Sequence, residues 1–153
     1  MTAACPGAKR VVAGGYRLDP TLAGDVLIVG NAPAPDGRGW VVRALVRPDR
    51  PTPPEPWALS AEAVCASGET VVVVQRSPSG TEPAQTVVAT CPPGLRPSGG
   101  GYQRQGSEAD IVVVVNTATA DGQGWVAHGE MRADTPELTV PWELTVAAIC
   151  AGG

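Results

Sequence analysis

The sequence contains few aromatic, basic or histidine residues. Its 153 residues include no phenylalanine and one histidine, only 11 are Lys or Arg, and the formal net charge is −4. Nucleic-acid binding needs clustered basic side chains that neutralise phosphates, so we do not expect this acidic chain to bind nucleic acid. The apolar content of 43% is normal for a folded domain and argues against a disordered chain.

Long apolar runs are also absent from the sequence. The apolar runs reach only about five residues, far fewer than the roughly 20 that a membrane-spanning helix requires. Gly (19) and Pro (16) are abundant, and both destabilise helices, whereas the many valines favour strands. The composition therefore predicts an all-β fold without membrane insertion.

The four cysteines, Cys5, Cys65, Cys91 and Cys150, form no Cys-x-x-Cys pair. A zinc site needs clustered thiolates or imidazoles, which these spacings and a single histidine do not provide. An even number of widely spaced cysteines favours two disulfides, with four buried free thiols as the alternative. Disulfides are typical of secreted proteins. No signal-peptide pattern precedes Cys5, so we expect a mature segment of a secreted, extracellular protein.

An internal repeat is the strongest pattern in the sequence. Cys5-Pro6 matches Cys91-Pro92, and Gly14-Gly15-Tyr16 matches Gly100-Gly101-Tyr102. Further matches follow in the same order: Asp36-Gly37-x-Gly39-Trp40 with Asp121-Gly122-x-Gly124-Trp125, Pro56-Trp57-x-Leu59 with Pro141-Trp142-x-Leu144, and Cys65-Ala66 with Cys150-Ala151. We therefore predict an internally duplicated chain. Its parts are a first β repeat unit at 1–66, a connecting β-hairpin or linker at 67–90, and a second β repeat unit at 91–153.

Within each unit, apolar and polar residues alternate as they do in half-buried strands. Trp40 and Val42 share one face of such a strand, and Arg43 lies on the other. Each unit is predicted to be an antiparallel β-sandwich or prism, and the two units are predicted to be related by a pseudo-twofold axis. Of the three possible cysteine pairings, the repeat favours one disulfide per unit, Cys5–Cys65 and Cys91–Cys150.

Several local features of the units can also be predicted. Asp36-Gly37 and Asp121-Gly122 are typical of hairpin turns. The apolar runs 26–29 and 111–115 are expected to be strands covered on both faces. Residues 71–74 are expected to be paired and covered, because an open valine edge favours aggregation. The Gly-Gly-Tyr segments are expected where another backbone or a Trp ring approaches closely.

The order of these motifs resembles a module found in secreted actinobacterial proteins. That module reads Cys-Pro-x-Gly, Gly-Gly-Gly-Tyr, Asp-Gly-x-Gly-Trp and a final Cys-Ala, and it occurs singly or in tandem. The resemblance covers residues 5–66 and 91–151. It departs in the first unit, where Ala13 replaces the first glycine of the triplet. The resemblance implies secretion and a β unit closed by a disulfide, and it implies no enzymatic reaction.

Catalytic motifs and sets of metal ligands are not found in the sequence. There is no Gly-x-Ser-x-Gly nucleophile elbow. His128-Gly129-Glu130 matches half of a zinc-deaminase signature, but the Pro-Cys-x-x-Cys half is missing. Asp25, Asp36, Asp110 and Asp121 recur in both units, yet each turn supplies too few oxygen atoms for calcium. We therefore expect no catalytic residue, metal or cofactor, and an enzyme is the least favoured alternative.

Two groups of side chains are candidates for binding. The first group alternates apolar and charged residues on outward strand faces, as protein interfaces do. Its members are Val41, Arg43, Leu45 and Arg47, with His128 and Glu130 in the second unit. Unless this face is simply solvated, we predict a non-enzymatic binding or assembly module whose partner is another extracellular protein. The alternative is a lectin-like module, in which Tyr16 and Tyr102 form two pseudo-equivalent glycan-binding sites.

Overall fold

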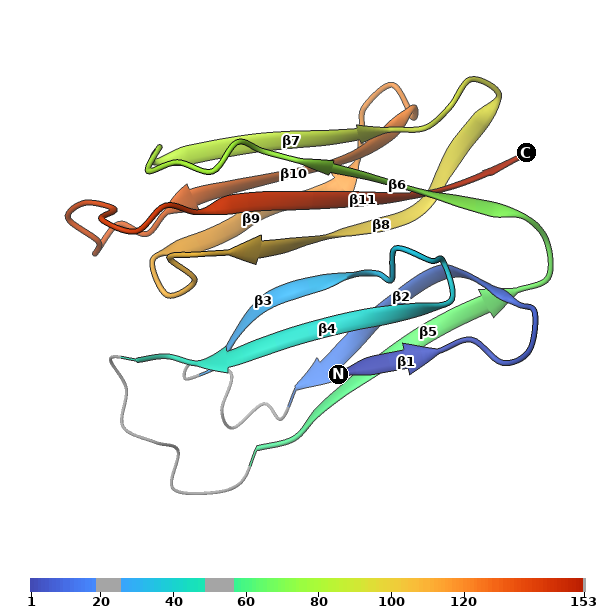
Figure 1. Ribbon diagram of the computed structural model, residues 1–153, viewed down its shortest axis with the longest axis horizontal. Helices are drawn as coiled ribbons and strands as arrows, with labels where there is room; N and C mark the ends of the chain where they lie inside the picture. The colour runs from blue at the N-terminus through green and yellow to red at the C-terminus, as the bar shows by residue number, and fades with distance from the viewer. Residues whose placement is uncertain (19–25, 49–56, 153) are drawn as a thin grey trace.

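A computed structural model describes residues 1–18, 26–48 and 57–152. Asp25 and Pro56 of the sequence patterns lie outside the described residues. These ranges contain eleven β-strands and no helix (Figure 1), which confirms the all-β prediction. The strands are β1 (Thr2–Ala4), β2 (Arg10–Leu18), β3 (Val26–Pro33), β4 (Gly39–Val46), β5 (Leu59–Ala66), β6 (Thr70–Arg76), β7 (Ala84–Thr90), β8 (Leu95–Gln105), β9 (Ile111–Ala118), β10 (Gly124–Met131) and β11 (Glu143–Gly152).

The described strands form three antiparallel sheets. The largest has six strands in the order β1-β4-β3-β8-β11-β6, and the smaller sheets are β7-β10-β9 and β2-β5. In the first half of the chain, β2-β5 packs against β1-β4-β3, and in the second half β7-β10-β9 packs against β8-β11 (Figure 1). Each half therefore encloses a core between two sheets.

The halves pair their strands in the same order and share one sheet through a single strand pairing. β4 lies between β1 and β3 as β10 lies between β7 and β9, and β2 pairs with β5 as β8 pairs with β11. The join is a short pairing of β3 with β8, in which Gly30 lies opposite Gln103 and Asn31 opposite Tyr102. Because β2 corresponds to β8 and β3 to β9, a pseudo-twofold axis would also pair β2 with β9. The described strands do not make that pairing, so the join is one-sided.

The segment between the repeats does not form the predicted hairpin. β6 pairs with β11 and β7 pairs with β10, so these strands belong to opposite sheets of the second half. The loop between them passes Trp142 at the end of the core, and Gly80 of this loop forms an isolated antiparallel β-bridge with Trp142. β6 ends the six-stranded sheet, and its Val71 and Val74 are 46% and 39% exposed. The expectation that residues 71–74 are covered is therefore wrong for Val71 and Val74, although all four residues are paired.

Both predicted disulfides are present, and their pairing is confirmed. Cys5 is bonded to Cys65 and Cys91 to Cys150, with Cα atoms 5.7 Å apart in each pair. Each disulfide joins the two sheets of its own half, because Cys5 and Cys91 directly follow β1 and β7 while their partners lie in β5 and β11. In the chain-entropy model, closing a loop of about 60 residues restricts the unfolded chain and stabilises the fold by roughly 4 kcal/mol.

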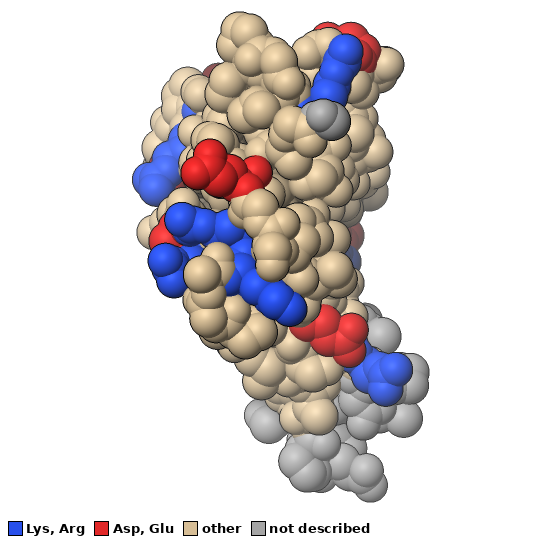
Figure 2. All heavy atoms as spheres, turned by 90° about the vertical axis from the view of Figure 1, so that its right-hand side faces the viewer, with Lys and Arg blue, Asp and Glu red and all other residues tan. Residues whose placement is uncertain are grey.

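The two Asp-Gly turns form as predicted. Gly37 and Gly122 have φ angles of +69° and +65°, a conformation that favours glycine. The Arg10 Nη1 donates to the Asp36 carbonyl at 2.8 Å, and the Arg96 Nη1 donates to the Gly122 carbonyl at 3.2 Å. In each half, an arginine near the beginning of a strand (β2 or β8) thus holds the Asp-Gly turn of the facing sheet. Figure 2 shows the end of the molecule where these loops lie, with basic and acidic side chains beside one another.

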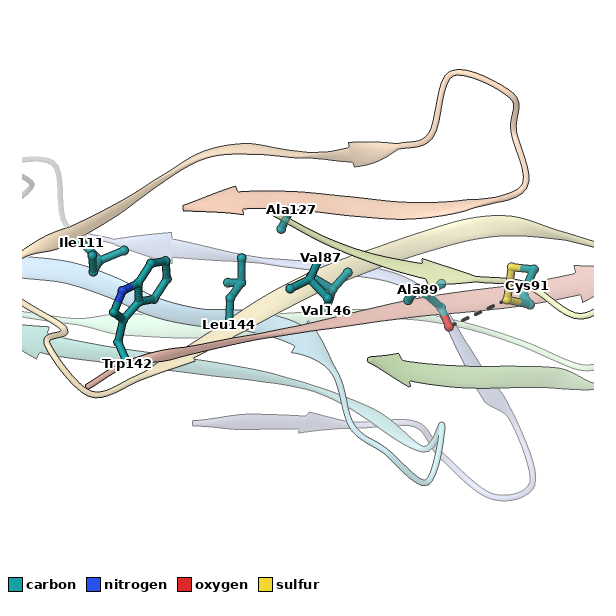
Figure 3. Close-up of a cluster of buried hydrophobic side chains, with 10 residues drawn as sticks. Val87, Ala89, Cys91, Ile111, Ala127, Trp142, Leu144 and Val146 are labelled. Carbon is teal, nitrogen blue, oxygen red and sulfur yellow. Dashed lines mark hydrogen bonds between the residues drawn. A yellow bond between two sulfur atoms is a disulfide. The ribbon is translucent and has the colours of Figure 1, made fainter. Parts of the chain in front are cut away.

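The core of the second half lies between β7-β10-β9 and β8-β11 (Figure 3). Leu144 and Val146 point from β11 toward Val87 and Ala127 of the facing sheet, and Trp142 closes the end of this row. Leu144, Val146 and Trp142 are all 0% exposed. The predicted alternation of inward residues is therefore realised in this strand.

Each half also packs a tryptophan ring against a glycine, as expected for the Gly-Gly-Tyr segments; Trp40 is buried and Trp125 is half-buried. A Cβ added to Gly14 would lie 2.2 Å from the Trp40 ring, and one added to Gly100 would lie 2.4 Å from the Trp125 ring. No side chain fits at such distances, so these positions require glycine. The Trp40 Nε1 donates to the Asn31 Oδ1 at 2.7 Å, and the Trp125 indole makes the corresponding bond at 2.7 Å.

Candidate functional site

A groove on the six-stranded sheet is a candidate binding surface, because the predicted partner-binding residue Arg43 lines it. It has a volume of about 110 Å³ and lies beside the join of the two halves. Its polar lining comes from four strands and includes Arg43 of β4, Gln103 of β8, Arg76 of β6, and Glu143 and Thr145 of β11. Arg76 and Glu143 form an ion pair with a nitrogen–oxygen distance of 3.8 Å. The groove therefore presents both signs of charge on a backbone that the sheet holds in place.

Arg43 is the predicted partner-binding residue that lines this groove. Its side chain is exposed, whereas Val41 and Leu45 on the same strand face are half-buried. Arg47 follows the end of β4 and lines a separate depression together with Asp110, Arg132 and residues 134–137 of the second half. The four residues predicted on this strand therefore do not act as one surface.

Arg47 lies beside an ion pair of the second half. The Arg132 Nε and Asp134 Oδ1 are 3.1 Å apart. The pKa of Asp134 is lowered, chiefly by the hydrogen bond from Arg132, and the positive charge of Arg47 adds to this effect. Arg47 therefore faces the second half of its own chain.

His128 and Glu130 lie on β10, in the three-stranded sheet of the second half. The His128 Nδ1 and the Thr86 Oγ1 are 2.7 Å apart, and the His128 Nε2 lies 3.7 Å from a Glu130 carboxylate oxygen. This sheet does not include β4, which carries Arg43. The predicted binding residues therefore fall on two different surfaces, because the join places the matching faces of the two halves in different sheets.

The two tyrosines predicted as equivalent glycan sites have different surroundings. Tyr16 on β2 is 45% exposed. Tyr102 is half-buried at the join, and its hydroxyl donates to the Ile28 carbonyl at 3.3 Å. Burial raises the pKa of Tyr102, with an opposing effect from Arg104 and a smaller rise from the nearby Tyr16. The two predicted sites therefore have different surroundings, because Tyr102 lies at the join and Tyr16 is exposed.

The apolar run 111–115 is not covered on both faces as predicted. Val114 and Val115 of β9 are 50% and 37% exposed, whereas Val29 of β3 is 1% exposed. The difference follows from the join, because β3 lies between β4 and β8 while β9 ends its sheet among the described strands.

Arg104 is a buried residue that sequence reasoning did not single out. It is 3% exposed, and its Nη1 donates hydrogen bonds to the carbonyls of Glu108 and Ile111. Burial lowers the pKa of Arg104. The bonds hold the loop between β8 and β9, which is a structural role. The repeat could have pointed to Arg104, because the corresponding residue of the first unit is the apolar Leu18 and an apolar match indicates a buried position.

The recurring aspartates serve as turn residues. The Asp36 Oδ1 accepts the amide N–H two residues further on at 2.9 Å. The Asp121 Oδ1 accepts the Gln123 N–H at 3.0 Å and the Thr119 hydroxyl at 2.6 Å. The Thr119 bond is the main cause of a lowered pKa at Asp121. Among the described residues, no group of three His, Cys, Asp or Glu side chains is placed to hold a metal ion.

Comparisons with protein-family models, curated proteins and solved structures found no match to this chain. No helix in the described ranges is long and apolar enough to cross a membrane.

Proposed function

We propose that the protein is a secreted, non-enzymatic binding or assembly module that acts through contacts with another extracellular protein. Two disulfides support this location, because such bonds persist in oxidising compartments. The equal strand-pairing order of the halves supports an origin by internal duplication. The resemblance to a tandem module of secreted actinobacterial proteins supports a modular role.

The observation that carries the proposal is the groove around Arg43. The sheet that forms it is shared by both halves, so two cores and two disulfides keep its shape. Exposed Val74 adds apolar area beside the charged lining. Arginine and apolar side chains on a preformed surface are characteristic of protein interfaces, and a rigid surface loses little entropy on binding.

Charge reversal at Arg43 tests the proposal. The oxidised protein is immobilised, exposed to extracellular proteins of its source and cross-linked, and the captured proteins are identified by mass spectrometry. We expect Arg43→Glu to reduce capture of a specific partner by roughly tenfold or more, which corresponds to about 1.4 kcal/mol or more. The thermal unfolding midpoint should not change, because Arg43 is exposed.

The matched control is Arg38→Glu, which makes the same charge change at an exposed turn residue outside the groove. This variant should capture the partner as the unchanged protein does. Equal capture by all three proteins would contradict the assignment of the groove.

Exposed Tyr16 supports one alternative, a glycan-binding site on the first half alone. Its ring is 45% exposed, and the neighbouring Gly15 leaves open space beside the backbone. Screening against a glycan array and cell-wall polysaccharides tests this function. Saturable binding that is lost in Tyr16→Ala and kept in Tyr102→Phe would favour the glycan site over the protein interface.

A further inference from the structure

The join between the halves leaves two corresponding strand edges without a partner. β3 pairs with β8, and in the repeat β3 corresponds to β9 and β8 to β2. Within the described ranges, β9 pairs only with β10 and β2 pairs only with β5. The reciprocal β2–β9 pairing is missing among the described strands, so each half keeps the edge that the other half uses in the join.

The open edges follow the same backbone course as the paired ones. The strand pairing skips Val29 in β3 and the corresponding Val114 in β9. It also skips Val12 in β2 and the corresponding Ser98 in β8. A bulge changes the direction and twist of a strand, so corresponding bulges give β2 and β9 the edge shapes of β8 and β3.

β2 has the features with which β8 receives a strand. A Cβ added to Gly101 of β8 would lie 2.0 Å from a carbonyl oxygen of β3, so this approach requires glycine. Gly15 occupies the corresponding place on β2, and nothing lies within 4 Å of its Cβ position. Tyr16 beside it is 45% exposed, whereas Tyr102 donates a hydrogen bond to a β3 carbonyl. β2 thus has the same glycine and tyrosine with which β8 receives β3, but no described strand pairs with this edge of β2.

β9 offers the corresponding incoming strand. Val114 is 50% exposed, while Val29 at the same place in β3 is 1% exposed. Asn116 accepts the Trp125 indole N–H at 2.7 Å, the same anchoring bond that β3 makes in the first half. Soluble proteins protect strand edges with charged residues or proline, and the sequence of β9 contains neither.

We propose that β9 of one copy pairs with β2 of the next copy, in the register of the β3–β8 join. This inference rests on the proposed function, assembly through protein contacts, and names a second copy of the chain as the partner. In this register Asn116 lies opposite Tyr16 and Val115 opposite Arg17, and the Tyr16 hydroxyl donates to the Val113 carbonyl. Because the contact is head-to-tail and leaves one open edge at each end, copies add in an open chain.

One position differs between the two incoming strands. Gly30 of β3 lies opposite Gln103, whereas Val115 of β9 lies opposite Arg17 in the proposed register. A Cβ on Gly30 would lie 3.2 Å from the Gln103 Cγ, part of a flexible side chain that can turn aside. The aliphatic stem of Arg17 packs along Val115 in the same way. A positive charge at position 115 would instead repel Arg17.

Sedimentation velocity of the oxidised full chain, from micromolar to millimolar concentration, tests the proposal. The average mass should rise with concentration and pass the dimer. Gly15→Val blocks the β2 edge, and Val115→Lys places a charge opposite Arg17. Each variant should weaken association by roughly tenfold or more, which corresponds to about 1.4 kcal/mol or more. Val88→Lys, at a 43% exposed valine of β7, is the control and should associate as the unchanged chain does.

Mixing the two variants separates this contact from unspecific aggregation. Gly15→Val keeps a functional β9 edge, and Val115→Lys keeps a functional β2 edge. An equimolar mixture should therefore form one-to-one dimers that do not grow, while each variant alone stays monomeric. Circular dichroism checks that both variants keep the β fold.

Three results would overturn the proposal: a monomeric unchanged chain at all concentrations, a mixture that stays monomeric, or variants that associate like the unchanged chain. Any of these together with Arg43-dependent capture of a different protein would overturn the self-assembly and leave the proposed function standing. Self-association without any Arg43-dependent capture would support the self-assembly and contradict the assignment of the groove, because Arg43 lies on neither proposed edge.

Discussion

The two halves share a sequence pattern but differ in burial. In the second half the inward residues of β11 are completely enclosed (Figure 3), namely Leu144, Val146, Ala148 and Cys150, each 0% exposed. In the first half the corresponding residues of β5 are only half-buried, namely Leu59, Ala61, Ala63 and Cys65. The same alternation of residue types therefore gives a tight core in one half and a looser one in the other.

The segment between the repeats causes this difference. β6 pairs with the second edge of β11, and the following loop crosses Trp142, whose Nε1 donates to the Glu82 carbonyl at 2.9 Å. In the described part of the first half, β5 pairs with β2 alone, and Trp57 is half-buried. Burial of a repeated strand thus depends on its neighbours, and only the second half has this additional segment as a neighbour.

Removing the two corresponding tryptophans should show the largest contrast. Trp142→Ala is expected to lower the free energy of unfolding by about 3–5 kcal/mol, because the ring is completely buried. Trp57→Ala should cost clearly less, since solvent already reaches that ring. Urea unfolding followed by circular dichroism measures both values. Equal losses would contradict the conclusion that the second half has the tighter core.

A side chain added at the corresponding glycines should sharpen the comparison at the join. Gly101→Val is expected to cost about 1–3 kcal/mol or more, because its Cβ would overlap the backbone of β3. Gly15→Val should cost almost nothing, since its Cβ position is open. Thermal unfolding at low protein concentration, where copies do not associate, compares the two. Two equally stable variants would mean that β3 and β8 are not joined in solution.

The corresponding tyrosines should differ by a smaller amount. Tyr102→Phe removes a partly buried hydrogen bond worth about 0.5–1.5 kcal/mol, while Tyr16→Phe should be nearly neutral. Burial raises the pKa of Tyr102, so its protonated form stabilises the folded state. This contribution is complete below the ordinary tyrosine pKa of about 10 and is lost as pH rises through the raised value.

Chemical unfolding at neutral and alkaline pH measures this difference. The unchanged protein and Tyr16→Phe should both lose stability as pH rises past the ordinary tyrosine range. Tyr102→Phe should lose less over the same interval, because the titrating group is gone. The same alkaline loss in all three proteins would show that Tyr102 is not buried at the join.

The smallest expected effect concerns the turn at Asp121. Hydrogen bonds from Thr119 and Gln123 lower the pKa of this exposed carboxylate. A lowered pKa means that the stabilisation is present above the ordinary aspartate pKa and is lost as pH falls through the lowered value. Asp121→Asn and Thr119→Val should therefore reduce the acid dependence of unfolding slightly. An unchanged acid dependence in both variants would show that this turn does not contribute to it.

Local residue patterns were sufficient to predict the fold class, the disulfides and the turns. Alternation with a period of two predicted strands, because successive side chains on a strand point to opposite faces. The two Asp-Gly turns followed from the conformations that glycine adopts easily. The repeat predicted Cys5–Cys65 and Cys91–Cys150, since each unit contains one cysteine near each end. The contacts of Gly14 and Gly100 with tryptophan rings also followed from the motif.

The choice of neighbouring strands was decided by the tertiary structure alone. The valine runs of β6 and β7 resemble a hairpin, but each pairs with a strand far along the chain, and nothing local distinguishes the two outcomes. The β3–β8 join, which makes Tyr102 half-buried and leaves Tyr16 exposed, likewise depends on how the assembled halves fit. Residue patterns act over a few positions, whereas an edge takes whichever strand the complete fold brings to it.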